Sequence, residues 1–299
     1  MKIRDLFPLR SPTFSFEFFP PKTEQEVDEL LLRARELQPL SPSFISVTYG
    51  AGGSTRRNTI DLVCRFQEEL GILGMAHITC VGHSQEELRE VLTELKGRGV
   101  ENLMCLRGDP PKGQTDFVPA PDGFAHAAEL VALARSLDAF CIGVAGYPEP
   151  HPECGDKQQD LEHLKAKVDR GADFITTQLF FDNRDYFDFC TRARDLGIKK
   201  RIIPGIMPIT NYRQIIRFAK MCGSSIPEAL RKRLEPVADD PDATLAIGVE
   251  WAWRQCEELL AGGAPGIHFY TLNRSLATQR IFERLRRSSV RTLLPSAAA

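Results

Sequence analysis

Residues 14–48 read FSFEFFPPKTEQEVDELLLRARELQPLSPSFISVT, and their pattern predicts a strand, a helix and a second strand. The runs at 14–19 and 44–48 are short, apolar and rich in phenylalanine or β-branched residues, as buried strands are. Between them, residues 23–37 place leucines on one face of a helix. Because right-handed crossovers put a helix between successive parallel strands, this unit favours a parallel sheet.

The same alternation continues along the chain and predicts eight strands. A helical pattern at 84–96 opens with Ser84 and has Glu87 three residues later, which is a capping box. The interval 211–262 is too long for one helix and carries glycine and proline breakers, so several helices are expected there. The candidate strands are 14–19, 44–48, 76–81, 102–106, 140–145, 174–179, 202–204 and 266–270.

Eight strand–helix repeats without a linker predict an α/β protein, a closed (β/α)8 TIM barrel. We expect a single domain over residues 1–299, with a disordered tail from about residue 295. A chain of 299 residues is also long enough for two domains of ordinary size, but no linker sequence supports such a division.

The composition and charge of the chain limit the kinds of molecule that it is expected to bind. The chain is 42% hydrophobic and 26% charged, and its formal net charge of -2 provides no field that would gather nucleic acid or an anionic membrane. No apolar run approaches the roughly 20 residues that span a bilayer, and the first ten residues do not resemble a signal peptide. The eight cysteines are scattered without a CxxC pair. We therefore expect a cytoplasmic protein with a small-molecule partner, no membrane association and no bound metal.

In a (β/α)8 barrel, the carboxyl ends of the strands build the active site. Glu17 interrupts the aromatic run of the first strand, and desolvation by those rings predicts a raised pKa, which suits a general acid. The alternative is a carboxylate paired with an arginine or facing water at an edge. Thr48 ends the second strand beside a glycine-rich loop at 50–55. His77 and Thr79 share a face of the third strand, where an interior histidine is more often structural than catalytic.

Further polar residues follow the later strands. Arg107 and Asp109 flank Gly108 after the fourth strand, where an internal ion pair is the plain alternative. The loop with Tyr147 could hold a His/Glu metal set, but its spacing matches no established motif. Gln178 can hydrogen-bond a heterocycle, although a buried structural glutamine is equally compatible. Other candidates are a helical stripe of Asp160, His163 and Lys167, which a solvated surface would also explain, and Leu272 with Arg274 after the last strand.

Six motifs, in register along the chain, resemble the methylenetetrahydrofolate reductase family. The resemblance extends from about residue 14 to about residue 285. It implies an FAD-containing barrel that reduces 5,10-methylenetetrahydrofolate to 5-methyltetrahydrofolate, the one-carbon donor for methionine synthesis, with NADH or NADPH as reductant. Both substrates would use one face of the flavin in a ping-pong reaction. The motifs are FSFEFFPPK from Phe14, SVTYGAGGST from Ser46, LRGDPP from Leu106, AGYPEPHPE from Ala145, TQLFFD from Thr177 and FYTLNR from Phe269.

The resemblance also implies roles for individual residues. Glu17 would be the general acid that protonates N10 of the folate, and Asp109 the carboxylate that favours the cationic intermediate. Substrate contacts would come from Glu17, Gln178, Phe218, Leu272 and Arg274. The FAD positions would be Thr48, His77, Arg107, Asp109, His126, Ala127, Tyr147, Asp160, His163 and Lys167.

Three positions depart from the family pattern. His126 stands where tyrosine is common, His163 where asparagine is found, and Ala166 where a basic residue can meet the pyrophosphate. These departures concern FAD affinity and adenosine placement. Bacterial-type members form homo-oligomers, so we expect one here. Because the chain ends before the regulatory domain of larger eukaryotic members, we expect no inhibition by S-adenosylmethionine.

Three other functions remain open at this stage. A flavin-independent relative would transfer hydride directly from nucleotide to folate. A folate-binding or assembly protein on an inactive barrel should have lost its acid, whereas Glu17, Asp109 and Gln178 are present. Another FAD barrel, such as a proline dehydrogenase, would need an amino-acid site.

Overall fold

The computed structural model describes residues 1–21, 23–49, 56–110, 113 and 116–295. The glycine-rich loop at 50–55 and the end of the predicted disordered tail, residues 296–299, lie outside the described residues. Within the described chain, none of the helices combines the length and the apolar character needed to cross a bilayer.

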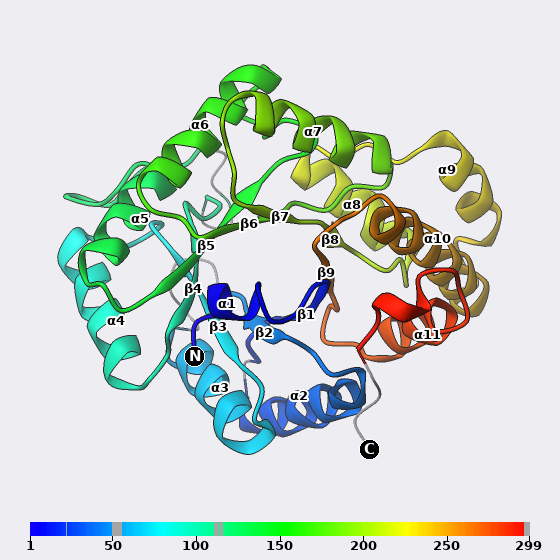
Figure 1. Cartoon of the computed structure of the whole chain (residues 1–299), viewed down its shortest axis with the longest axis horizontal. Coiled ribbons are helices and arrows are strands. Elements are labelled where there is room, and N and C mark those ends of the chain that lie inside the picture. Colours follow the sequence, from blue (N-terminus) through cyan, green and yellow to red (C-terminus); the bar gives the residue numbers. More distant parts are fainter. Residues whose placement is uncertain (22, 50–55, 111–112, 114–115, 296–299) are drawn as a thin grey trace.

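The strands form one parallel sheet that closes into a barrel, as predicted (Figure 1). Pro204 splits the seventh barrel strand into two short pieces, of which β7 pairs with β6 and β8 pairs with β9. Proline lacks the N–H that a central strand donates, which accounts for the break. The strands are β1 (Thr13–Phe18), β2 (Phe44–Val47), β3 (Gly74–Thr79), β4 (Asn102–Leu106), β5 (Cys141–Gly146), β6 (Phe174–Thr177), β7 (Arg201–Ile203), β8 (Gly205–Ile206) and β9 (Gly266–Tyr270).

Helices surround the strands as an outer ring in Figure 1. The capping box of α4 is confirmed, since the Ser84 side chain accepts from the Glu87 amide and the Glu87 carboxylate accepts from the Ser84 amide. The interval 211–262 contains several helices, as expected. The helices are α1 (Ile3–Leu6), α2 (Glu24–Leu37), α3 (Arg56–Leu70), α4 (Gln85–Gly97), α5 (Ala127–Ser136), α6 (Lys157–Asp169), α7 (Asn183–Asp195), α8 (Tyr212–Cys222), α9 (Glu228–Leu234), α10 (Pro241–Ala261) and α11 (Leu276–Leu285).

Alternation along β1 separates two environments. Successive side chains of a strand point to opposite faces, so Phe14, Phe16 and Phe18 all face the helices. Phe14 and Phe16 pack against Phe282 of α11, with ring centroids 5.1 and 6.0 Å apart, and Phe18 packs against α3. Ser15 and Glu17 therefore point into the barrel.

The amino end of the barrel is closed by α1, which lies over the middle of the strand ring in Figure 1. Ile3 belongs to a buried apolar cluster with side chains from the strands, including Phe44, Met75, Met104 and Phe174. The Ile3 amide also donates to Asn102 Oδ1 over 2.7 Å.

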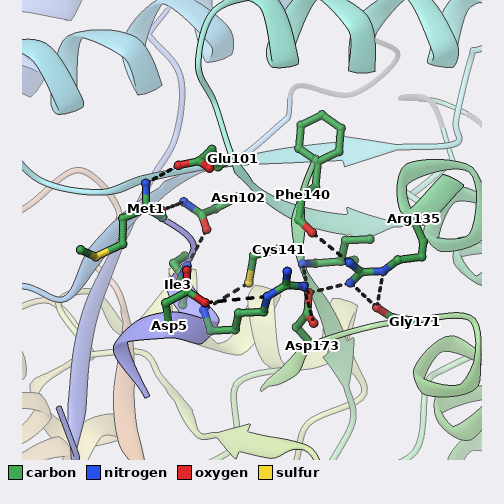
Figure 2. Close-up of polar contacts among 12 residues, drawn as sticks. Met1, Ile3, Asp5, Glu101, Asn102, Arg135, Phe140, Cys141, Gly171 and Asp173 are labelled. Atoms are coloured by element: carbon green, nitrogen blue, oxygen red, sulfur yellow. Dashed lines mark hydrogen bonds and ion pairs between the residues drawn. The ribbon is translucent and has the colours of Figure 1, made fainter. Parts of the chain in front are cut away.

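A charged group fastens the same helix to the barrel. The side chain of Asp173 accepts from Arg4 Nη1 at 3.1 Å, from Arg135 Nη2 at 2.7 Å and from the Ile142 amide at 2.8 Å. Figure 2 shows Asp173 beside Arg135, below the residues that receive α1. The amino end of the barrel is thus covered by α1, whereas the active sites of (β/α)8 barrels lie at the carboxyl end.

Candidate active site

Several of the predicted site residues follow strands at the carboxyl end of the barrel. Thr48 follows β2, Arg107 and Asp109 follow β4, and Tyr147 and Gln178 follow β5 and β6. Parallel strands end at the same rim, so these residues share one face of the molecule.

Phe218 on α8 and Leu272 after β9 also lie at the carboxyl end of the barrel. They pack on one apolar cluster that includes Leu179 after β6 and Tyr270 at the end of β9. Leu272 is held there by an uncommon backbone, because Leu272 and Asn273 have φ values of 52° and 59°. The Asn273 side chain fixes this turn by bonding both the amide and the carbonyl of Phe19.

Glu17 lies at the centre of a buried polar cluster. Its Oε2 atom is 3.4 Å from His77 Nε2 and 3.3 Å from His268 Nε2, and all three residues are at most 8% exposed. Ser15, one inward position earlier on β1, places its Oγ 2.7 Å from His268 Nδ1. The cluster thus joins three strands of the barrel through one carboxylate.

The predicted direction of the Glu17 pKa was wrong. Burial alone would raise it, but the nearby His77 and the hydrogen bond from His268 outweigh burial and lower the pKa of Glu17. The prediction assumed that the phenylalanines of β1 surround the carboxylate. In the structure those phenylalanines face the helices, whereas Glu17 faces the imidazoles of His77 and His268. Burial lowers the pKa of His77 to about 4, against the opposing charge of Glu17.

Arg107 does not pair with Asp109 in the way that the plain alternative suggested. It forms a bidentate ion pair with Glu153, with both N–O distances 2.6 Å, and lies 4.8 Å from the ring centroid of Phe117. Asp109 is exposed. Burial and then the charge of Asp109 raise the pKa of Tyr147, so these two side chains face the same space.

The polar stripe on α6 divides into buried and exposed members. Lys167 donates to the carbonyl of Ala145 over 2.6 Å, and burial lowers its pKa to about 8. Asp160 is half-buried, and its pKa is raised by burial against the opposing effect of Lys167. His163 is exposed. The stripe is therefore more than a solvated surface, because its lysine reaches under the end of β5.

The loop before α6 places Cys154 close to two predicted FAD positions on that helix. Ligand atoms of Cys154, Asp160 and His163 lie within 4.8 Å of one another. Lys167 already faces Asp160 as a positive charge, which disfavours a cation at this point.

The remaining predicted positions lie at the edges of the site. His126 is exposed at the start of α5, with its amide bonded to Glu129, and Ala127 is the first residue of that helix. Gln178 is half-buried, and its Oε1 accepts from the neighbouring Leu179 amide at 2.9 Å, which leaves its NH2 group for another partner. Arg274 is exposed.

Comparison with known proteins matches this arrangement to one family. A model of the protein family described as methylenetetrahydrofolate reductase covers residues 2–286. The chain belongs to the methylenetetrahydrofolate reductase family.

Similar members of this family come from plants and bacteria. The chain is 42% identical over 283 residues to methylenetetrahydrofolate reductase (NADH) 1 of Arabidopsis thaliana, covering 91% of this chain and 48% of that protein. It is 37% identical to 5,10-methylenetetrahydrofolate reductase of Pectobacterium carotovorum subsp. carotovorum, covering 87% and 86%. The chain thus spans about half the length of the plant relative and most of the bacterial one.

A solved structure supports the fold. An uncharacterized protein from Clostridium thermocellum that binds two copies of 5-methyl-5,6,7,8-tetrahydrofolic acid has a TM-score of 0.61 and 16% identity. The alignment covers 94% of this chain and 96% of that one. At this identity the likeness concerns the barrel alone.

Three members of the site in this reductase-family chain were not predicted from its sequence: Ser15, His268 and Tyr270. Tyr270 contacts the ring of His268 edge-on at 5.3 Å and donates to the Thr177 carbonyl. Its pKa is raised by burial first and then by Glu17 and other nearby groups. Period-two alternation could have placed Ser15 on the face of Glu17, but the register between β1 and β9 was needed to find His268.

Proposed function

We propose that the protein reduces 5,10-methylenetetrahydrofolate to 5-methyltetrahydrofolate with FAD as cofactor and NADH or NADPH as reductant. The names of the plant relatives favour NADH. The observation that carries the proposal is the single carboxylate of Glu17, buried at the end of β1 between two imidazoles in a reductase-family barrel. The reaction would belong to methionine biosynthesis and take place in the cytoplasm, in a homo-oligomer in which this barrel is the catalytic domain.

The residues present fit an FAD. Nε2 of His77 and Oγ1 of Thr79 are buried and have no hydrogen-bond partner within the described part of the chain, so both polar atoms could bond a cofactor beneath the carboxyl end of the barrel. Arg107 and Lys167 supply the positive charge that a pyrophosphate requires. When bound, FAD would carry the two electrons between the nucleotide and the folate.

Residues from several strand ends and from two helices, α5 and α6, would together hold the cofactor. Thr48, His77 and Asp109 would lie by the flavin, and Tyr147 would approach it from β5. The start of α5, with His126 and Ala127, and the stripe of Asp160, His163 and Lys167 would bind the remainder. For Arg107 to bind the cofactor, its pair with the half-exposed Glu153 must loosen. Arg107 is 21% exposed and its pair with Glu153 is bidentate, so the phosphates of the cofactor would have to replace both hydrogen bonds.

The folate would bind over Glu17. Gln178 would hydrogen-bond the pterin through its amide, Phe218 and Leu272 would pack against its ring, and Arg274 would meet an outer polar group. A bound pterin would remove water from Glu17 and so favour the neutral form of this carboxyl. Glu17 would then protonate N10, while Asp109 stabilises the positive charge that develops in the folate.

An anaerobic spectral titration tests this function. The purified protein should be yellow, lose that absorbance with NADH or NADPH, and recover it with methylenetetrahydrofolate. A colourless protein that still turns over would support direct hydride transfer, and a colourless inactive protein would support a folate-binding role. Recovery with proline-derived substrates instead of folate would indicate another FAD barrel.

Glu17→Gln tests the assignment of the acid. It should leave bleaching by the nucleotide nearly unchanged and slow recovery by the folate about 100-fold or more, the usual contribution of general acid catalysis. Asp61→Asn, which removes a carboxylate of an exposed ion pair on α3, is the matched control. Equal losses in both half-reactions would refute the role of Glu17.

A further inference from the structure

Ser15 and His268 form a buried pair directly behind Glu17. They are register partners on β1 and β9, and both are 0% exposed. The contacts run in series, from Ser15 Oγ to His268 Nδ1 at 2.7 Å and from His268 Nε2 to Glu17 Oε2 at 3.3 Å. The proposed function gives this pair no role.

The chemistry of the three groups selects one tautomer of the histidine. If the Ser15 hydroxyl donates to Nδ1, the proton of a neutral imidazole resides on Nε2 and is donated to Glu17. The opposite tautomer would place the Nε2 lone pair against an oxygen of the carboxylate. Because Oε2 of Glu17 lies 3.3 Å from Nε2 and an ionised carboxylate oxygen can only accept, the first arrangement is the attractive one.

His77 does not duplicate this contact. Its Nε2 is 3.4 Å from the same Oε2 atom, yet it has no hydrogen-bond partner among the described residues. The directed hydrogen bond to Glu17 thus comes from His268. Both imidazoles approach Oε2, which leaves Oε1 as the oxygen for the acid proton.

We propose that His268, held in its Nε2–H tautomer by Ser15, is a positioning residue that fixes Oε2 of Glu17 and directs Oε1 to the substrate. This inference rests on the proposed function, because it assumes that Glu17 is the acid. Glu17 Oε1–H would give its proton to N10, and the resulting carboxylate would keep the hydrogen bond from His268, which loses no proton. The other groups that face Glu17 are His77 from β3, Tyr270 from β9 and Ser46 from β2.

Ser15→Ala in the FAD-loaded protein is the direct test. Without the hydroxyl donor, the 15N resonances of His268 should move away from those of a pure Nε2–H tautomer. The limiting rate of flavin reoxidation by folate should fall about tenfold, the worth of a hydrogen bond to a charged group. The midpoint of its pH profile should move upward, because the carboxylate loses stabilisation. Bleaching by NADH should not change.

Two further variants keep the test decisive. Ser43→Ala removes another buried hydroxyl, which accepts from the Phe14 amide outside the cluster, and should leave the pH midpoint in place. His268→Gln retains an N–H donor and should recover more of the folate rate than His268→Phe. If wild-type protein shows no folate turnover, the proposed function fails. If it turns over but Ser15→Ala changes neither the 15N resonances nor the pH midpoint, or if His268→Gln and His268→Phe behave alike, the role of His268 is overturned.

Discussion

Asp173 should be among the most sensitive charged positions for stability, because it fastens α1 to the barrel. Its side chain is 11% exposed and pairs with Arg4 and Arg135, which are 34% and 27% exposed. Removing one partner of a fully buried ion pair costs about 3–5 kcal/mol. Since both arginines keep contact with water, we expect Asp173→Ala to lower the free energy of unfolding by about 2–3 kcal/mol.

Graded variants separate the charge from the hydrogen bond. Asp173→Asn can still accept from the Ile142 amide, so we expect a smaller loss of about 1–2 kcal/mol. Asp169→Ala removes a carboxylate that is 57% exposed and paired with Lys165 four residues away, and should cost about 0.5 kcal/mol or less. Urea unfolding monitored by circular dichroism measures all three. A loss for Asp173→Ala no larger than that for Asp169→Ala would refute the reasoning.

Two other predictions concern a buried cation and a close helix contact. The pKa of Lys167 is lowered by burial from 10.5 to about 8. Cofactor-free protein should therefore gain stability between pH 8 and 10.5, where only the unfolded chain still holds this proton, by about 3 kcal/mol in total. Lys167→Met should lack this gain, and parallel unfolding curves would contradict the prediction. A Cβ at Gly248 would lie 1.9 Å from the Ile209 carbonyl oxygen, whereas one at Gly97 meets nothing within 4 Å. Thermal unfolding should show Gly248→Ala destabilised by about 2 kcal/mol or more and Gly97→Ala unchanged or stabilised by about 0.5 kcal/mol; equal effects would contradict the clash.

Much of the fold could be predicted from local pattern. The strands at Asn102–Leu106 and Gly266–Tyr270 have the predicted bounds, and the others differ by one or two residues at an end. Pattern alone could not show that Pro204 divides its strand between two neighbours. Nor could it show that the first residues of the chain form a helix against the barrel, because that helix is only four residues long and depends on tertiary contacts.

The contacts within the site were harder to predict from the sequence than the fold. Strand ends identified Glu17, His77 and Arg107, because the barrel rule depends only on element order. The partners of these residues depend on register and on loop paths. The sequence could not show that Arg107 would select Glu153, 46 residues away, or that His268 would lie behind Glu17 from 251 residues away. The pKa error has the same origin, since it assigned sequence neighbours where spatial neighbours determine the charge.

Helix α1, which covers the amino end of the barrel, affects how quickly Glu17 can exchange its proton with bulk water. Because Ile3 and its apolar neighbours pack across that end and Glu17 is only 8% exposed, we expect the acid to exchange protons with bulk water through an opening at the carboxyl end. A ligand that covers the opening would also isolate the acid. The protonation state present when folate arrives would then persist through the turnover, so a rapid change of pH after binding should not alter the rate of that cycle.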